Sequence, residues 1–171
     1  MRALLVIDMQ RWMFRTPDRA AQLPVLLQAI ERLSLDFEAR NQPLFDIRTE
    51  HKADRSTWSR LMLRYDYPCL LEGSEDTDTV DGLVPRGTRI TKTANDAFLG
   101  TDLETELHRQ GVSEIVLAGV FMDGCVGLTA AAAAQRGFAV CFADRAIGVR
   151  DQTQAIAIRS WLIEMYELST C

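Results

Sequence analysis

The sequence predicts an α/β fold in which a mostly parallel sheet is covered by helices on both faces. Short, continuous apolar runs alternate along the chain with longer segments whose apolar residues recur at helical spacing. This order is typical of a parallel sheet with crossover helices. The chain also has 171 residues without a repeat, a linker or a low-complexity segment. That length fits a single domain, 1–171, with a sizeable core.

The first half of the chain contains two expected strands and one long helix. Residues 3–7 are a continuous β-favouring apolar run, which indicates a strand buried on both faces. Residues 23–40 show apolar positions at helical spacing, and the second strand is expected at 44–48. Residues 51–87 are polar and rich in Asp, Gly and Ser. We expect loops there, with one short helix near 58–65.

The second half of the chain continues the alternation. We expect strands at 89–91, 115–118 and 139–143, and helices at 102–110, 125–136 and 151–168. Gly111 and Gly137 are placed to end two of these helices, and Asp151 is placed to cap the last one.

Composition and charge exclude several classes of protein. Hydrophobic residues make up 47% and charged residues 25%, as in an ordinary globular domain. A net charge of −5 without a dense basic patch argues against nucleic-acid binding. The apolar run at 3–7 is too short for a signal peptide or a membrane span. The four cysteines show no CxxC or paired spacing, so they favour a reducing, cytoplasmic location over a disulfide framework or a zinc site.

Three polar residues follow expected strands at the edge where such sheets bind ligands. Asp8 follows the first strand, Lys92 the third, and Cys125 stands across a short turn from the fourth. Unpaired N–H groups and partial positive charge at a helix start would favour the Cys125 thiolate, a nucleophile. Each residue alone also has a structural interpretation: an ion pair or cap for Asp8, a surface side chain for Lys92, and a buried helix start for Cys125.

The remaining candidates carry weaker signals. We expect His51 to be a solvated loop residue and His108 to lie on a polar helical face. The two histidines are far apart in the sequence, which argues against a multi-histidine metal site. Asp96 is expected to cap a turn. The glycines before and after Cys125 fit neither a phosphate-binding loop nor a dinucleotide motif.

Several segments taken together resemble the isochorismatase-like cysteine hydrolases. The matching segments are residues 4–10, 72–74 with 83–85, 92–103 and 119–126. Their order and spacing match the family over nearly the whole chain. The resemblance implies a three-layer α/β/α sandwich of Rossmann-like form, a catalytic triad of Asp8, Lys92 and Cys125, and a cis peptide bond at Val120–Phe121. It also implies a homodimer or homotetramer.

The chemistry implied by this triad needs no metal and no other cofactor. Asp8 would accept the proton of Cys125, and Lys92 would favour the charged forms of both. The sulfur would attack a carbonyl carbon, and the backbone N–H groups of Phe121 and Cys125 would hold the oxyanion. The expected substrate contacts are Gln10, Met13, Phe14 and Phe121. Met13 stands where the family usually has a phenylalanine, which alters the wall of the site.

Departures from the family pattern narrow the expected substrate to a small molecule with a C–N bond. Nicotinamidases of the superfamily carry an Asp-x-His metal motif where this chain has Thr49-Glu50-His51, which disfavours both that activity and bound zinc. Isochorismate hydrolases often lack the cysteine. We therefore expect hydrolysis of a small amide, ureide or carbamoyl compound through a thioester-type intermediate. Two alternatives stay open: an isochorismate-type vinyl ether hydrolase, and a non-catalytic binding or assembly module that retains the fold.

Overall fold

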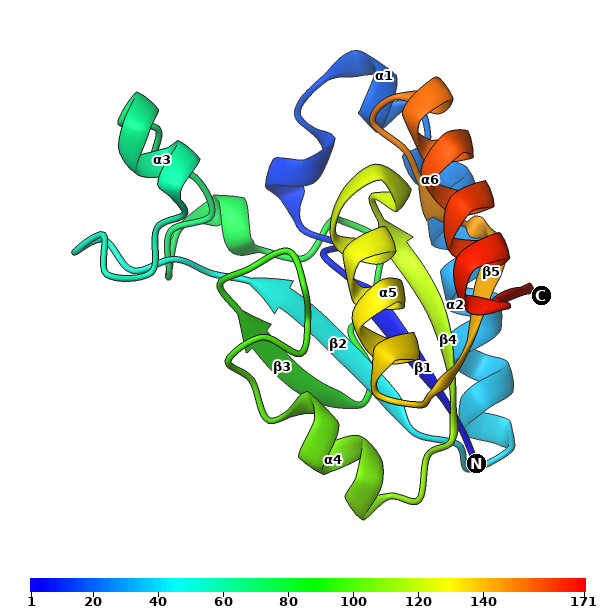
Figure 1. Ribbon diagram of the computed structural model, residues 1–171. Coiled ribbons are helices and arrows are strands. Elements are labelled where there is room, and N and C mark those ends of the chain that lie inside the picture. Colours follow the sequence, from blue (N-terminus) through cyan, green and yellow to red (C-terminus); the bar gives the residue numbers. More distant parts are fainter.

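A computed structural model describes all 171 residues and contains one six-stranded sheet (Figure 1). The strands are β1 Arg2–Ile7, β2 Leu44–Thr49, β3 Thr88–Lys92, β4 Glu114–Val120, β5 Ala139–Gly148 and β6 Ser169–Thr170. They lie in the order β3-β2-β1-β4-β5-β6, and every neighbouring pair is parallel. The strand order changes direction at β1, between β2 and β4. The carboxyl ends of β1 and β4 therefore flank the crevice where ligands bind in sheets of this kind.

Helices cover both faces of this sheet (Figure 1). The helices are α1 Pro17–Ala20, α2 Leu23–Ala39, α3 Arg60–Tyr65, α4 Leu103–Arg109, α5 Gly127–Gln135 and α6 Gln152–Tyr166. The short turns are the 3-10 turns η1 Arg11–Phe14 and η2 Glu75–Thr77 and the π-helical turn η3 Met122–Val126. Apolar residues of α2 pack on one face of the sheet, and those of α4, α5 and α6 pack on the other. The predicted α/β/α sandwich is confirmed.

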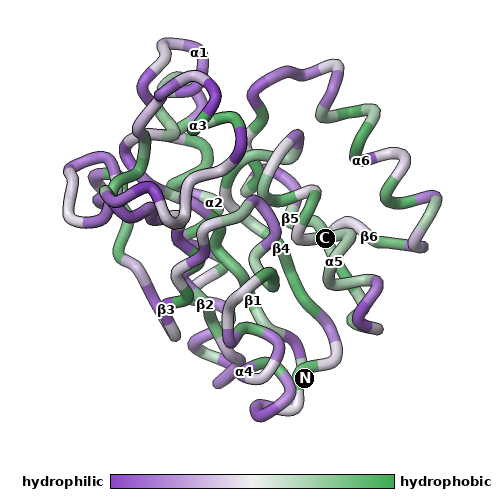
Figure 2. Tube along the Cα trace, turned by 60° about the vertical axis from the view of Figure 1, so that its left-hand side comes forward, coloured by the Kyte–Doolittle hydropathy of each residue, from purple (hydrophilic) through white to green (hydrophobic).

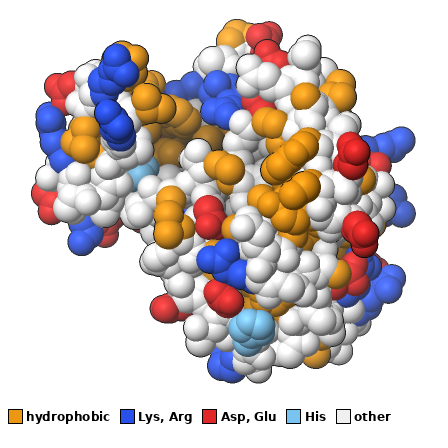
Figure 3. Space-filling model, viewed as in Figure 1, with side chains coloured by type: hydrophobic (Ala, Val, Ile, Leu, Met, Phe, Trp, Pro, Cys, Tyr) orange, Lys and Arg blue, Asp and Glu red, His pale blue; other side chains and the backbone are white.

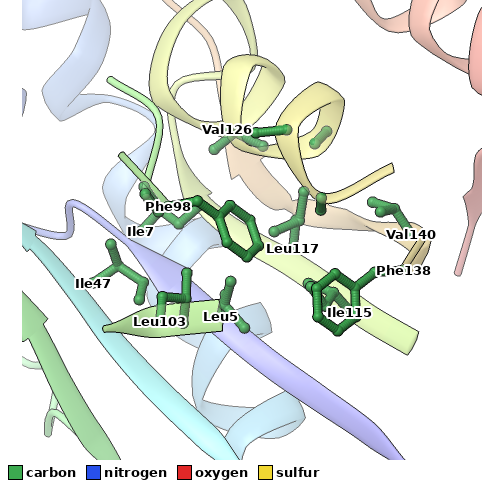
Figure 4. Close-up of a cluster of buried hydrophobic side chains, with 14 of the residues drawn as sticks. Leu5, Ile7, Ile47, Phe98, Leu103, Ile115, Leu117, Val126, Phe138 and Val140 are labelled. Carbon is green, nitrogen blue, oxygen red and sulfur yellow. The ribbon is translucent and has the colours of Figure 1, made fainter. Parts of the chain in front are cut away.

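The continuous apolar runs are explained by burial on both faces of the central strands. Successive side chains of a strand point to opposite faces. In β1, Leu5 and Ile7 join the cluster under α4 and α5, while Leu4 joins the cluster under α2 (Figure 4). Hydrophobic residues are therefore concentrated in the central strands, whereas the segments around α1 and α3 are largely hydrophilic (Figure 2). No helix is long and apolar enough to cross a bilayer.

Two elements at the edge of the sheet differ from the prediction. The strand expected at 139–143 continues to Gly148, and a short sixth strand pairs with it through Cys141 and Ser169. This pairing brings Cys171 beside Cys141, and the two form a disulfide with their Cα atoms 6.1 Å apart. The cysteine spacing is expected to favour a reducing location over a disulfide framework, and this one bonded pair departs from that expectation. Cys141 and Cys171 are 30 residues apart in the sequence. Their contact depends on which strands are neighbours in the sheet, and this spacing alone does not predict it.

The helix expected at 125–136 begins later than predicted. Cys125 lies in the π-helical turn η3, and α5 starts only at Gly127. Asp123 and Gly124 within this turn have non-helical backbone angles. Cys125 is thus presented by an irregular turn between β4 and α5 rather than by the first turn of a regular helix.

Candidate active site

Asp8, Lys92 and Cys125 meet at the carboxyl end of the sheet. Lys92 Nζ lies 2.9 Å from Asp8 Oδ2 and 3.4 Å from Cys125 Sγ. Asp8 and Lys92 are 0% and 1% exposed, whereas Cys125 is partly exposed and lines a cavity. The three elements that carry them therefore place a buried ion pair directly beneath an accessible thiol.

Thr49, at the end of β2, completes the polar cluster. Its hydroxyl donates to Asp8 Oδ1 at 2.9 Å and accepts from Lys92 Nζ at 2.6 Å. Lys92 also donates to the Ala94 carbonyl at 3.0 Å. A buried ion pair is tolerated only when its remaining hydrogen-bonding groups are satisfied, and these contacts satisfy them. Thr49 is not among the site residues predicted from the sequence, although it lies at a strand end as Asp8 does.

The cluster is electrostatically arranged to keep the cysteine as a thiol. Burial, followed by the negative charge of Asp8, raises the pKa of Cys125 to about 12, against the lowering effect of Lys92. Burial lowers the pKa of Lys92, but the negative charge of Asp8, and that of Cys125 when it is ionised, outweigh burial, so that this pKa is raised. The expectation that the free site favours thiolate is wrong, because burial and Asp8 prevail over Lys92 and no regular helix begins at Cys125.

The cavity above Cys125 has a volume of about 620 Å³. It lies between the projecting segment that carries α3 and the body of the molecule, and Figure 3 shows basic side chains around this hollow. Trp58 and Met62 line the α3 side, and Met13, Phe121 and Arg19 line the opposite side. This volume is in the range of small-molecule sites.

Met13 and Phe121 thus line the cavity, whereas the other two residues expected to contact the substrate do not. The Gln10 side chain is 1% exposed and is bonded to β2: Oε1 accepts from Thr49 N at 2.9 Å, and Nε2 donates to Thr49 O at 2.9 Å. Phe14 packs against Phe121, and the centroids of the two rings are 6.4 Å apart. Neither residue lines the cavity, so Gln10 instead fixes the position of Thr49.

His51 lines the cavity and is only 5% exposed, so the expectation of a solvated loop histidine is wrong. Its backbone N–H donates to the Leu70 carbonyl, which folds the segment after β2 against a distant loop. Burial above all lowers the pKa of His51. The Nδ1 atom lies 2.9 Å from the Thr57 carbonyl, which can only accept, so Nδ1 carries the proton. Nε2 of the neutral ring is then left as an acceptor.

Phe121 directly precedes the turn η3 that carries Cys125, and its backbone N–H is one of the two expected oxyanion donors. The Val120–Phe121 peptide bond is cis. The Phe121 carbonyl accepts from Gly124 N at 2.9 Å and Val126 N at 3.1 Å, which holds the turn around Cys125. The Phe121 N–H makes no hydrogen bond within the chain. It is therefore free to donate to a developing oxyanion, as such sites require.

Two further residues lie where the sequence indicates. Asp96 accepts from Phe98 N at 2.8 Å and so closes a turn, as expected. The His108 side chain is 59% exposed on α4. Nowhere in the chain do three or more His, Cys, Asp or Glu side chains gather closely enough to hold a metal ion.

Known proteins resemble this chain in sequence and fold over most of its length. The maleamate amidohydrolase of Pseudomonas putida is 29% identical over 158 residues, which cover 86% of this chain and 72% of that protein. An isochorismatase family protein from Desulfovibrio vulgaris superposes with a TM-score of 0.86 at 24% identity, covering 99% of this chain and 93% of that one. For the N-carbamoylsarcosine amidase of Thermoplasma acidophilum the TM-score is 0.81 at 23% identity, with 99% and 94% covered. The family model of the isochorismatase domain matches residues 2–161, and the chain therefore belongs to the isochorismatase family of hydrolases.

Proposed function

We propose that this hydrolase is a cysteine amidohydrolase that cleaves a C–N bond of a small amide, ureide or carbamoyl compound. The observation that carries the proposal is the position of Cys125 Sγ, which lines the cavity 3.4 Å from the ammonium group that also binds Asp8. A thiol, a carboxylate and an ammonium group in contact are the parts that nucleophilic acyl transfer needs. The amidohydrolase and the amidase among the similar proteins support the same class of reaction.

The first step of the reaction forms a covalent acyl-enzyme. Asp8 accepts the Cys125 proton as Sγ attacks the carbonyl carbon, so the high pKa of the resting thiol is no obstacle. Lys92 stays beside both groups and stabilises the sulfur as negative charge develops on it. The Phe121 N–H and the Cys125 N–H donate to the oxyanion. The C–N bond then breaks, and protonated Asp8 gives its proton to the leaving nitrogen, which departs as ammonia or an amine.

The second step hydrolyses the thioester. Asp8 is again a carboxylate and removes a proton from the attacking water, and the C–S bond breaks as Cys125 recovers its proton. Thr49 hydrogen-bonds both Asp8 and Lys92, and it keeps the carboxylate in one orientation through both steps. No side chain outside the described cluster is needed to move a proton.

The test is ammonia or amine release from a panel of small amides, ureides and carbamoyl compounds. We expect Cys125→Ala and Asp8→Asn each to lower kcat by at least about 10³-fold, as for other nucleophiles and bases that act as a unit. Circular dichroism checks that both variants remain folded. Cys69→Ala is the matched control, because Cys69 also lines the cavity but lies outside the polar cluster.

The two alternatives predict different outcomes in the same assay. A vinyl ether hydrolase that uses Asp8 and Lys92 would release no ammonia, would cleave isochorismate and would tolerate Cys125→Ala. A non-catalytic module would turn over neither class of compound. Retained amide hydrolysis in pure Cys125→Ala protein would exclude the proposed nucleophile.

A further inference from the structure

The charges around the cavity are all of one sign. Three arginines line it: Arg19, Arg60 and Arg150. No aspartate or glutamate does, although the chain as a whole carries a net charge of −5. A cleft lined by one sign of charge attracts ligands of the opposite sign.

Two acidic side chains that adjoin residues of the cavity, Asp8 and Asp123, do not cancel this charge, because both already have a basic partner. Asp8 is paired with Lys92. Asp123, whose side chain is 2% exposed, accepts from Arg150 Nε at 3.3 Å and from the Arg150 backbone N at 2.9 Å. The side chains of Arg19 and Arg60, by contrast, make no ion pair and no hydrogen bond within the chain. Two guanidinium groups at the cavity thus remain uncompensated.

Arg19 is the better placed of these two groups. Its Cζ lies 5.2 Å from the centroid of the Phe121 ring, which also receives Arg150 at 5.8 Å. Stacking on an aromatic ring holds a guanidinium in one orientation while leaving its N–H fork free. Phe121 in turn holds the turn of Cys125 through its carbonyl. Arg19 is therefore fixed to the same residue that is to bind the oxyanion, whereas Arg60 is exposed on α3.

We propose that Arg19 binds a carboxylate of the substrate, so that the natural substrate is the monoamide or ureide of a small carboxylic acid. This inference rests on the proposed amide hydrolysis and specifies its substrate class. A planar guanidinium matches a carboxylate through two parallel hydrogen bonds. Arg60 adds positive charge at the mouth of the cavity, and Arg150 remains bound to Asp123. Neutral amides lack the group that Arg19 recognises.

Binding without turnover provides the first test. Calorimetric titration of the Cys125→Ala protein compares malonamate, succinamate and glutaramate with the neutral diamide of each acid. We expect at least one acid to bind about tenfold or more tightly than its diamide, in line with a hydrogen bond to a charged group. Adding Arg19→Gln should abolish that preference, and Arg19→Lys should retain part of it. Arg64→Gln is the control, because Arg64 stacks on Tyr65 outside the cavity and should leave the preference unchanged.

Turnover by the protein with Cys125 intact separates this inference from the function on which it rests. For the preferred acid, Arg19→Gln should raise KM about tenfold or more while kcat changes little, since it removes binding remote from the reacting atoms. If the acids bind selectively but no amide is hydrolysed, the proposed function is wrong and the carboxylate site stands. If amides are hydrolysed without preference for the acids, and Arg19→Gln has no effect, the carboxylate site is overturned and the function stands.

Discussion

Asp8 has two opposite effects on Cys125, and a single substitution separates them. As a base, Asp8 is needed for turnover. As a negative charge it raises the pKa of the thiol, while Lys92 lowers it. Replacing Asp8 by Asn removes the negative charge and leaves Lys92 in place, so the pKa should fall. We therefore expect Asp8→Asn to speed alkylation of Cys125 by iodoacetamide at pH 8 although it abolishes hydrolysis.

Peptide mass analysis after timed alkylation measures this effect. The wild-type rate should rise with pH up to at least pH 10 without a plateau, because the pKa lies near 12. Lys92→Met should slow the reaction, which is the opposite direction. Cys69 serves as an internal control, since its pKa is raised by burial and then by Asp76, not by Asp8. Slower labelling of Cys125 in Asp8→Asn would contradict this account of the site.

Among the elements, β4 must approach β1 closely for the site to form. Gly119 in β4 pairs with Ile7, the residue before Asp8, and has a φ of +102°. A Cβ at this position would overlap the backbone of Ile7, which cannot move without breaking the strand pair. We expect Gly119→Ala to destabilise the fold by about 1–3 kcal/mol through overpacking, with backbone strain in addition. Displacement of Asp8 should also lower kcat.

Gly111→Ala provides the matched control for this substitution. Gly111 lies in the turn that follows α4 and has a φ of +65°. A Cβ at this position would meet no atom within 4 Å. Only the strain of about 1 kcal/mol should remain, and kcat should be unchanged. Urea unfolding monitored by circular dichroism measures both free energies of unfolding. Equal losses in the two variants would show that contact between β1 and β4 is not the cause.

The elements that could be predicted from the sequence are those whose pattern follows from burial alone. Both faces of β1 are buried, so its run is continuous, and α2 has one buried stripe. The extension of β5, the strand β6 and the irregular turn at Cys125 depend on neighbours that are distant in the sequence. Local pattern carries no information about such neighbours.

At the scale of the whole molecule, the strand order explains why part of the site could be predicted. Lys92 ends β3, Asp8 follows β1 and Cys125 follows β4 across a turn. Parallel strands bring these carboxyl ends to one edge of the sheet. His51, which follows β2, and Arg19, which lies in the short helix α1, also line the cavity, and the sequence does not specify the path of either segment. Gln10 lies close to Asp8 in the sequence and is expected to contact the substrate. Its side-chain amide instead hydrogen-bonds to the backbone of Thr49 in β2.

The Cys141–Cys171 disulfide joins β5 to the residue after β6 and so encloses α6. A cross-link over 30 residues restricts the unfolded chain, and the chain-entropy model gives a stabilisation of up to about 3–4 kcal/mol. Cys141 pairs with Val116 within β4, whereas Cys125 lies beyond the carboxyl end of that strand, which is Val120. We therefore expect reduction to lower the free energy of unfolding while kcat stays the same.

Urea unfolding with and without a reductant measures this difference. Cys171→Ser should unfold like the reduced wild-type protein and should not respond to reductant, whereas the control Cys69→Ser should behave like wild type. A cytoplasmic location stays a prediction, and in a reducing cytoplasm only the reduced form would be present. We expect the reduced form to stay folded. Its helix α6 still packs on α5 and the sheet through Ala155 and Leu162. If reduction leaves the unfolding free energy unchanged, the two thiols are not bonded in the purified protein.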